Sequence, residues 1–262
     1  MGSSITAERK DPWTMPDIPQ LWHEEPIPGL TPEGEIACAL RVLHSLGYDD
    51  YYHGHISVWQ PDRTILTNPW EVVWDRVKAS DILRIDDRGR KISGKYSPSP
   101  GLRLHYLVEH YAPADLKPKI ILHQHPFYAT MWATLKRIPP IYEQGGTWHV
   151  PEIHLVPDFP LYEPDVITPE HGEAIARAGW ALLGDHGVMI AQPTMHDTVH
   201  AGAVLEWRCR VAWEMEGRKD ARPMDREHAR NSGRRIANHP QIKQWWSAMM
   251  HREVDKDPGV LK

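Results

Sequence analysis

Histidines in two separate segments are the residues of this chain best suited to bind a metal. His123 and His125 flank Gln124 at the end of an apolar, β-branched run. Side chains at positions i and i+2 of a strand point to the same face, so both imidazoles can reach one ion. His186 lies in a Gly-Asp-His-Gly turn between two apolar runs, where glycines allow a sharp bend that projects the imidazole into a cleft. Taken alone, each segment also fits ordinary strand-end or turn histidines.

A second pair with the same spacing, His53 and His55, competes for the metal role. The pair flanks Gly54 and comes directly before the predicted strand residues Ile56 and Ser57. Its i, i+2 spacing again puts two imidazoles on one face. These histidines are equally suited to bind a substrate or to orient a loop, and the residue pattern leaves that choice open.

Strands and helices must position these segments, and the sequence predicts an irregular alternation of both. The first helix has typical end signals: Thr31 is a suitable N-cap, Pro32 suits the first turn, and Gly47 ends the apolar period. We expect strands at 54–59, 64–66, 82–85 and 120–123, another after the turn at 86–89, and two within 180–190 that meet at 184–187. We expect helices at 31–46, 101–111, 126–135, 168–178, 196–216 and 240–256, and a Pro-rich loop at 138–166.

Composition places this 262-residue chain among ordinary globular proteins. Hydrophobic residues make up 41% and charged residues 25%, which excludes disordered and collagen-like classes. The formal net charge of −5 favours neither nucleic acid nor an anionic membrane as a partner, and the apolar runs are too short to cross a bilayer. The N-terminus shows no apolar signal-peptide core and the two cysteines form no framework, so we expect a reduced, cytoplasmic protein.

Two parts of the chain are expected to differ in structure. Residues 1–30 are punctuated by prolines and have no sustained apolar period, which predicts an extended N-terminal arm that packs over the domain or over a neighbouring subunit. Residues 31–262 are expected to form one domain with a helical C-terminal tail. The arm and the tail are rich in tryptophan, which favours a subunit interface.

Three motifs in order give the chain a family resemblance. The sequences Gly54-His55-Ile56-Ser57, Leu122-His123-Gln124-His125-Pro126 and Leu183-Gly184-Asp185-His186-Gly187 resemble those of the class II aldolase/adducin-like family, over about residues 31–217. The resemblance implies a three-layer α/β/α fold with a central, mostly antiparallel sheet, and a homotetramer with active sites between subunits. It also implies that His123, His125 and His186 hold one divalent metal ion per chain, which is Zn, Fe or Mn.

Two departures from the family pattern change the expected function. Sugar-phosphate aldolases of this family carry a catalytic glutamate where this chain has Gly101, and their phosphate-binding segment is replaced here by 68–75. The departures resemble adducin-like enzymes without phosphate substrates, which include decarboxylases of aromatic acids and, more distantly, non-heme-iron oxygenases. We therefore expect a divalent-metal-dependent lyase that cleaves a C–C bond, of decarboxylase or aldolase type. The alternatives are an Fe(II)-dependent oxygenase on the same scaffold and a non-catalytic adducin-like interaction protein.

Other residues must then move protons and hold the small-molecule substrate. The loop after the metal helix, from which family members draw active-site groups, suggests Glu143 and Tyr142 as catalytic residues. Substrate contacts are expected from the residues His55, Ser57, Tyr128 and His149. Glu109 lies four residues beyond His105, a spacing that predicts a hydrogen-bonded pair on one helix face.

Tryptophans near the motifs indicate the kind of substrate. The chain has 12 tryptophans, and four of them lie close to the motifs in sequence: Trp70, Trp74, Trp132 and Trp148. A pocket lined with aromatic rings suits an aromatic, non-phosphorylated substrate. Core and interface packing explain the same residues equally well.

Overall fold

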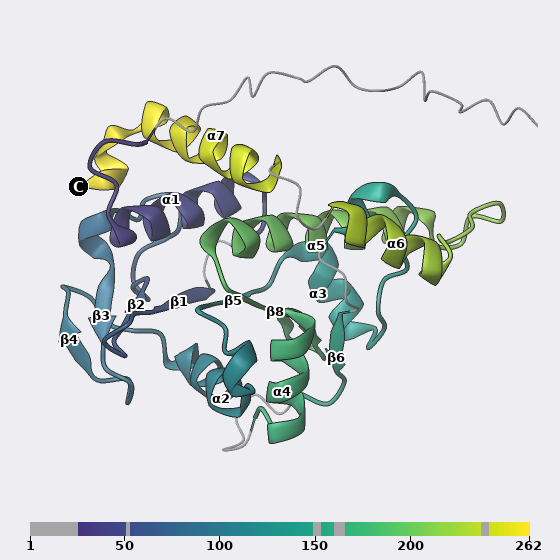
Figure 1. Ribbon diagram of the computed structural model, residues 1–262, viewed down its shortest axis with the longest axis horizontal. Helices are drawn as coiled ribbons and strands as arrows, with labels where there is room; N and C mark the ends of the chain where they lie inside the picture. The colour runs from purple at the N-terminus through teal and green to yellow at the C-terminus, as the bar shows by residue number, and fades with distance from the viewer. Residues whose placement is uncertain (1–25, 51–52, 149–152, 160–165, 237–240) are drawn as a thin grey trace, which may run out of the picture.

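An eight-stranded sheet forms the centre of the protein (Figure 1). The computed structural model describes residues 26–50, 53–148, 153–159, 166–236 and 241–262. The strand order is β4-β3-β2-β1-β5-β8-β7-β6. The strands are β1 (His55–Trp59), β2 (Ile65–Thr67), β3 (Leu83–Ile85), β4 (Lys91–Ser93), β5 (Ile120–Gln124), β6 (His154–Val156), β7 (Trp180–Leu183) and β8 (Gly187–Gln192). Among these strands β6 pairs in parallel with β7 and the other pairs are antiparallel, which confirms the predicted sheet type.

Helices cover both faces of the sheet and complete the expected three layers. The helices are α1 (Pro32–Ser45), α2 (Arg103–Tyr111), α3 (Phe127–Thr134), α4 (Pro169–Ala178), α5 (Met195–Met215), α6 (Arg226–Ile236) and α7 (Gln241–Lys256). One layer contains α1, α3 and α5, with α7 packed outside α1 and α5, and the opposite layer contains α2 and α4. Among the described residues, no helix is both long and apolar enough to span a membrane.

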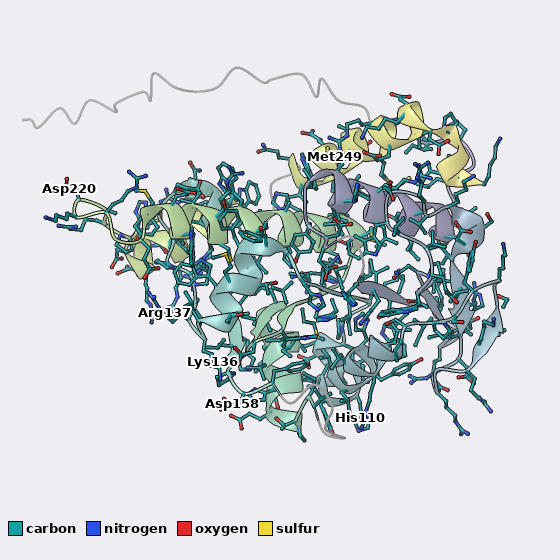
Figure 2. All side chains as sticks on the ribbon, turned by 180° about the vertical axis from the view of Figure 1, so that it is seen from behind. His110, Lys136, Arg137, Asp158, Asp220 and Met249 are labelled. Carbon is teal, nitrogen blue, oxygen red and sulfur yellow. The ribbon has the colours of Figure 1, made fainter. Side chains whose placement is uncertain are left out.

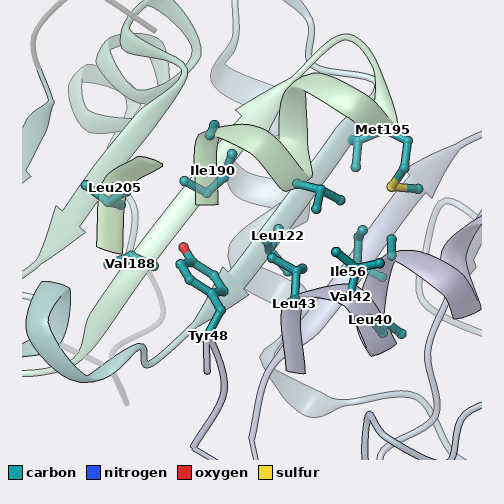
Figure 3. Close-up of a cluster of buried hydrophobic side chains, with 14 of the residues drawn as sticks. Leu40, Val42, Leu43, Tyr48, Ile56, Leu122, Val188, Ile190, Met195 and Leu205 are labelled. Carbon is teal, nitrogen blue, oxygen red and sulfur yellow. The ribbon is translucent and has the colours of Figure 1, made fainter. Parts of the chain in front are cut away.

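The alternation of side chains along β5 separates two apolar cores. Ile120 and Leu122 point into the core shared with α1 and α5, and Figure 3 shows Leu122 within it. Ile121 points to the other face, into the core shared with α2 and α4. Successive side chains of a strand alternate between faces, so His123 lies on the α2 and α4 side of the sheet. The strand therefore presents this imidazole at the end of a buried, apolar layer.

Most of the predicted elements are confirmed, and two were missed. Thr31 and Thr168 accept the N-cap hydrogen bonds of α1 and α4 as their positions predict. The Pro-rich loop expected at 138–166 contains β6, whose three residues are too few to show a strand period and form a strand by pairing with the edge of β7. The buried residues of helix α6 are the small residues Ala229 and Gly233, so the helix lacks the stripe of large apolar side chains that sequence analysis detects.

The predicted division between arm and domain stays a prediction. Residues 1–25 lie outside the described part of the chain, and 26–30 lead directly into α1. The C-terminal tail is helical as expected: α7 packs on α1, and Trp246 is buried in the shared core.

Candidate metal centre

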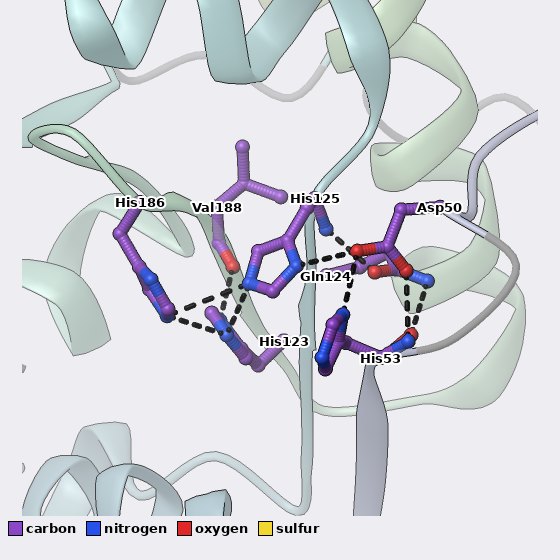
Figure 4. Close-up of polar contacts among 7 residues, drawn as sticks. All are labelled: Asp50, His53, His123, Gln124, His125, His186 and Val188. Atoms are coloured by element: carbon purple, nitrogen blue, oxygen red, sulfur yellow. Dashed lines mark hydrogen bonds and ion pairs between the residues drawn. The ribbon is translucent and has the colours of Figure 1, made fainter.

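Three histidines from two segments converge at one end of the sheet (Figure 4). His123 is the penultimate residue of β5, His125 directly follows the strand, and His186 lies in the turn between β7 and β8. Antiparallel pairing of β5 with β8 brings that turn beside His123 and His125. The Nε2 atom of His123 lies 3.2 Å from that of His125 and 3.1 Å from that of His186, and the third Nε2 pair is 3.5 Å apart.

The turn that carries His186 is tightly constrained. Asp185 has a φ of 58°, a left-handed conformation that asparagine and aspartate tolerate better than most residues. A side chain at Gly187 would meet the His125 ring, and its Cβ would stand 2.6 Å from the Gln124 carbonyl oxygen. Phe159 stacks on the His186 imidazole with ring centroids 5.0 Å apart. These contacts fix the direction in which His186 points.

Ion pairs outside the site tie this turn to the turn that follows α3. The Lys136 ammonium lies 3.1 Å from a carboxylate oxygen of Asp158 (both labelled in Figure 2). The same ammonium lies 3.4 Å from a carboxylate oxygen of Asp185. Water screens such exposed pairs and they contribute little to stability, so packing and turn geometry carry most of the positioning.

Hydrogen bonds at the far side of two rings determine which nitrogen faces the centre. His123 Nδ1 donates to the Val188 carbonyl at 2.8 Å, and His125 Nδ1 donates to an Asp50 carboxylate oxygen at 2.9 Å. When both imidazoles are neutral, as metal ligands are, only one nitrogen of each carries a proton, so both Nε2 atoms present bare lone pairs. These lone pairs face each other at hydrogen-bond distance with no proton to share. A cation between them removes that repulsion.

The donor set fits a divalent metal ion. Tetrahedral coordination with nitrogen at about 2.0–2.1 Å places ligand nitrogens about 3.3–3.4 Å apart, close to the spacings found here. Burial, and then the neighbouring histidines, hold the pKa of His123 well below its usual value, and burial lowers the pKa of His186 to about 4. Both side chains are therefore neutral near pH 7, as metal ligands must be. Three imidazoles leave a coordination position open, as catalytic sites require.

A buried chain of polar side chains adjoins the centre. Ser57 Oγ lies 2.7 Å from His105 Nδ1, and His105 Nε2 lies 2.9 Å from His55 Nδ1. The His55 ring in turn lies 5.0 Å from that of His123, its register partner on β5. Burial holds the pKa values of His55 and His105 well below the usual value, so this row of hydrogen-bonded side chains carries no charge.

The predicted pairing of His105 with Glu109 is wrong. Helix α2 packs under β1, so His105 is buried against Ser57 and His55, while Glu109 pairs with Lys117 at 2.7 Å. Sequence analysis missed the role of His105 because a helical period shows that a residue faces inward but not which strand it meets.

The sequence of this chain decides its family. Residues 34–213, more than half of the chain, match the Class II Aldolase and Adducin N-terminal domain. The chain belongs to this family.

Relatives of this class II aldolase and adducin family member differ in their activities. Over 213 residues it is 25% identical to a Streptomyces roseochromogenus protein, 4-hydroxy-3-prenylphenylpyruvate oxygenase/4-hydroxy-3-prenylbenzoate synthase, covering 78% of this chain and 74% of the relative. It is 26% identical over 187 residues to the meiotically up-regulated gene 14 protein of Schizosaccharomyces pombe, covering 67% and 69%. The fold resembles that of L-fuculose 1-phosphate aldolase from Glaciozyma antarctica, with a TM-score of 0.74 at 19% identity, covering 88% and 91%. Metal-dependent aldolases and epimerases make up much of this superfamily, which supports an enzyme.

In this class II aldolase fold the two histidines of the competing pair, His53 and His55, lie in different environments. His55 belongs to the buried chain, whereas His53 is exposed and bonds through Nδ1 to Asp50 at 3.0 Å. Asp50 and His53 form a second group with His125 whose ligand atoms lie within 4.8 Å of one another. The metal role of the pair at 123 and 125 stays a prediction, now supported by convergence with His186.

The other predicted site residues lie in different places. Tyr128 lies in the first turn of α3, where its backbone N–H and that of Ala129 donate to Glu206. The Glu143 carboxylate accepts the backbone N–H groups of Gly145 and Gly146, and Tyr142 packs against the main core. Among the described residues, no hydrogen bond or ring contact joins Glu143 or Tyr142 to the three histidines. His149 lies outside the described residues.

The four tryptophans divide between core and site. Trp132 is fully buried and donates from Nε1 to the Cys209 carbonyl at 2.9 Å, and Trp148 packs on His200. Trp70 and Trp74 line a cavity of about 300 Å³ beside His53. The cavity is at the small end of the range for ligand pockets.

Proposed function

We propose that this protein is a divalent-metal-dependent lyase that cleaves a C–C bond in a small, aromatic, non-phosphorylated substrate, by decarboxylation or an aldol-type reaction. The observation that carries the proposal is the convergence of three Nε2 atoms within 3.5 Å of one another, two of them with bare lone pairs. Membership of a family of metal-dependent aldolases supports it.

Each residue of the centre has a distinct part in this proposal. His123, His125 and His186 would hold the metal, which would polarise a substrate oxygen and stabilise the charge that develops there as the bond breaks. His55 lies beside His123 and offers its Nε2 to the substrate. Ser57 and His105 hold the His55 ring in place from behind, so Ser57 supports the substrate site rather than facing it directly.

The surroundings of the cavity beside His53 support a substrate without a phosphate group. Trp70 and Trp74 provide aromatic surface, while Asp49 and Glu71 contribute negative charge. None of the described residues that line it is a lysine or an arginine, so a phosphate dianion would meet no cation there. Gly101 likewise leaves no acid at the position of the aldolase glutamate.

A neighbouring subunit completes the site in this proposal. Glu143 and Tyr142 make no hydrogen bond or ring contact with the three histidines of their own chain, so we assign their predicted acid and base roles to the site of an adjacent copy. Phe127 and Trp207 are 66% and 52% exposed and line one cavity of about 560 Å³ with Tyr128. Exposed aromatic surface of this kind favours an interface, and we propose the homotetramer common in the family.

The location proposed for the enzyme is the cytoplasm. Cys38 and Cys209 are both free and buried. Buried, unpaired thiols suit a reducing compartment.

The decisive experiment combines metal analysis with assays in the presence and absence of oxygen. Purified protein is analysed for divalent ions and then incubated with aromatic acids and hydroxy ketones under air and under argon. We expect about one ion per chain, loss of turnover with a chelator, and equal turnover under both gases. Metal-free protein that turns over none of these compounds would instead support the non-catalytic, adducin-like alternative.

An Fe(II)-dependent oxygenase is the second candidate, favoured by the relative whose name records an oxygenase and a synthase of a prenylbenzoate. Three imidazoles with open positions hold iron as well as zinc, because the affinity order alone does not select the metal. Oxygen consumption in step with product formation, and no turnover under argon, would replace the lyase with this function.

A further inference from the structure

Asp50 connects the metal centre to His53 through a single carboxylate. One carboxylate oxygen, Oδ2, lies 2.9 Å from His125 Nδ1 and 3.0 Å from His53 Nδ1 (Figure 4). The other oxygen, Oδ1, accepts the backbone N–H of His53 at 2.8 Å. Asp50 lies in the segment before β1 and is 75 positions away from His125 in sequence. No motif in the sequence pointed to it.

We propose that Asp50 is the positioning residue of the metal centre, which holds His125 with its Nδ1 protonated and its Nε2 directed at the ion. The inference rests on the proposed metal site. A carboxylate on the far nitrogen of a ligating imidazole fixes the ring's tautomer and orientation and raises its basicity. The Val188 carbonyl accepts the corresponding hydrogen bond from His123 and orients its ring, but this carbonyl carries no net charge. Asp50 is thus the charged member of this outer shell.

The geometry separates Asp50 from the ligands themselves. Its Oδ2 contacts Nδ1 of His125, whereas the other two histidines meet Nε2 on the opposite side of the same ring. Asp50 could ligate the same ion only if His125 turned away from His123 and His186. In this arrangement the carboxylate therefore acts through His125, and it does not replace the glutamate absent at position 101.

His53 holds Asp50 in place in turn. His53 contacts both oxygens of the Asp50 carboxylate, Oδ1 through its backbone N–H and Oδ2 through its ring Nδ1. The His53 ring also lies 5.7 Å from that of His125 and 5.8 Å from that of Trp70. This role accounts for His53 without making it a ligand.

The neighbouring residue Asp49 provides a matched control. Its carboxylate pairs with His44 Nδ1 at 2.9 Å, the same contact that Asp50 makes to His125. His44 lies in the last turn of α1. It belongs to no group of potential metal ligands among the described residues. Asp49→Asn therefore removes an equivalent charge beside an imidazole that does not hold the metal.

The test measures zinc binding and ring tautomers in parallel. Wild type, Asp50→Ala, Asp50→Asn and Asp49→Asn are compared for the Zn²⁺ dissociation constant by chelator competition and for ions per chain by elemental analysis. Long-range ¹H–¹⁵N NMR correlations report the His125 tautomer in metal-free protein, and thermal unfolding reports folding. We expect Asp50→Ala to weaken zinc binding by about 10–100-fold at one ion per chain, with loss of the single Nδ1–H tautomer. Asp50→Asn, which keeps the acceptor and loses the charge, should fall between Asp50→Ala and wild type, and Asp49→Asn should bind like wild type.

Distinct results would overturn this inference and the proposed function. Zinc bound at one site with the same affinity and the same His125 tautomer in both Asp50 variants overturns the inference alone. So does a wild-type stoichiometry of two ions that drops to one in His53→Ala, because Asp50 and His53 would then be ligands of a second ion. Wild-type protein without zinc affinity overturns the metal site and the proposed function with it.

Discussion

The His55 imidazole fills the space that a side chain at position 101 would need. A Cβ atom built on Gly101 would lie far inside van der Waals contact with Nε2 of the His55 imidazole, and within 3.1–3.2 Å of its neighbouring ring carbons. The imidazole is buried and held at its other nitrogen by His105, so it cannot simply rotate away. The His55 ring can therefore keep this position only because residue 101 is a glycine without a Cβ atom.

This steric overlap predicts that Gly101→Ala disrupts the buried hydrogen bonds among His55, His105 and Ser57. The new methyl group displaces His55 and breaks its bond to His105, and we expect a loss of about 1–3 kcal/mol in the free energy of unfolding, measured with denaturant. The same change in a His55→Ala background should cost much less, because the obstructing ring is gone. Equal costs in both backgrounds would show that the two residues do not compete for space.

The two histidine pairs are separated by two single variants. His123→Ala should leave folded protein that has lost most of its metal, because His123 Nε2 is central to the cluster. His53→Ala should retain most of the ion, since the His53 imidazole bonds to Asp50 and is not one of the three converging histidines. Elemental analysis of both proteins, with thermal unfolding as the folding control, decides the assignment. Loss of the ion from His53→Ala and its retention by His123→Ala would refute the ligand set.

Removal of the metal should lower stability without unfolding the protein. Binding to the folded state alone contributes about 2.7 kcal/mol when free metal is at a hundred times its dissociation constant. For a chain of this size that corresponds to about 5–10 °C in Tm. Calorimetry before and after dialysis against a chelator measures the difference, and re-addition of the ion should restore it. Identical melting curves would mean that the histidines hold no structural or catalytic ion.

The proposed tetramer predicts that a charge on the exposed aromatic surface lowers the molar mass. Trp207 on α5 is 52% exposed, and an aspartate there would place an unpaired charge in the proposed interface. We expect Trp207→Asp to lower the molar mass measured by light scattering, relative to a wild-type tetramer. Lys219→Asp, in the exposed segment after α5, is the control and should leave the mass unchanged. Monomeric wild-type protein at micromolar concentration would refute the tetramer.

The fold was more accessible from sequence than the chemistry around the metal. Caps such as Thr31 and Thr168 act within one turn, so local residues reveal them, and a strand-end His-x-His pair shows its shared face through alternation alone. Asp50 and His105 carry no such signal. Each acquires its role from a partner at least 50 positions away, through strand pairing that no local pattern encodes. The same reason explains why β6, which forms by pairing with β7, went unnoticed.

The three histidines lie on or directly beside strands that are already hydrogen-bonded neighbours. Main-chain pairing of β5 with β8 runs from Ile120 to Gln124 and requires no imidazole. The polypeptide can therefore complete its sheet first and acquire its ion afterwards, through a rim where His125 and His186 are only partly covered. Because a finished site accepts whichever suitable ion arrives, the proposed activity would follow the local supply of metal in a cell more than any preference built into the chain.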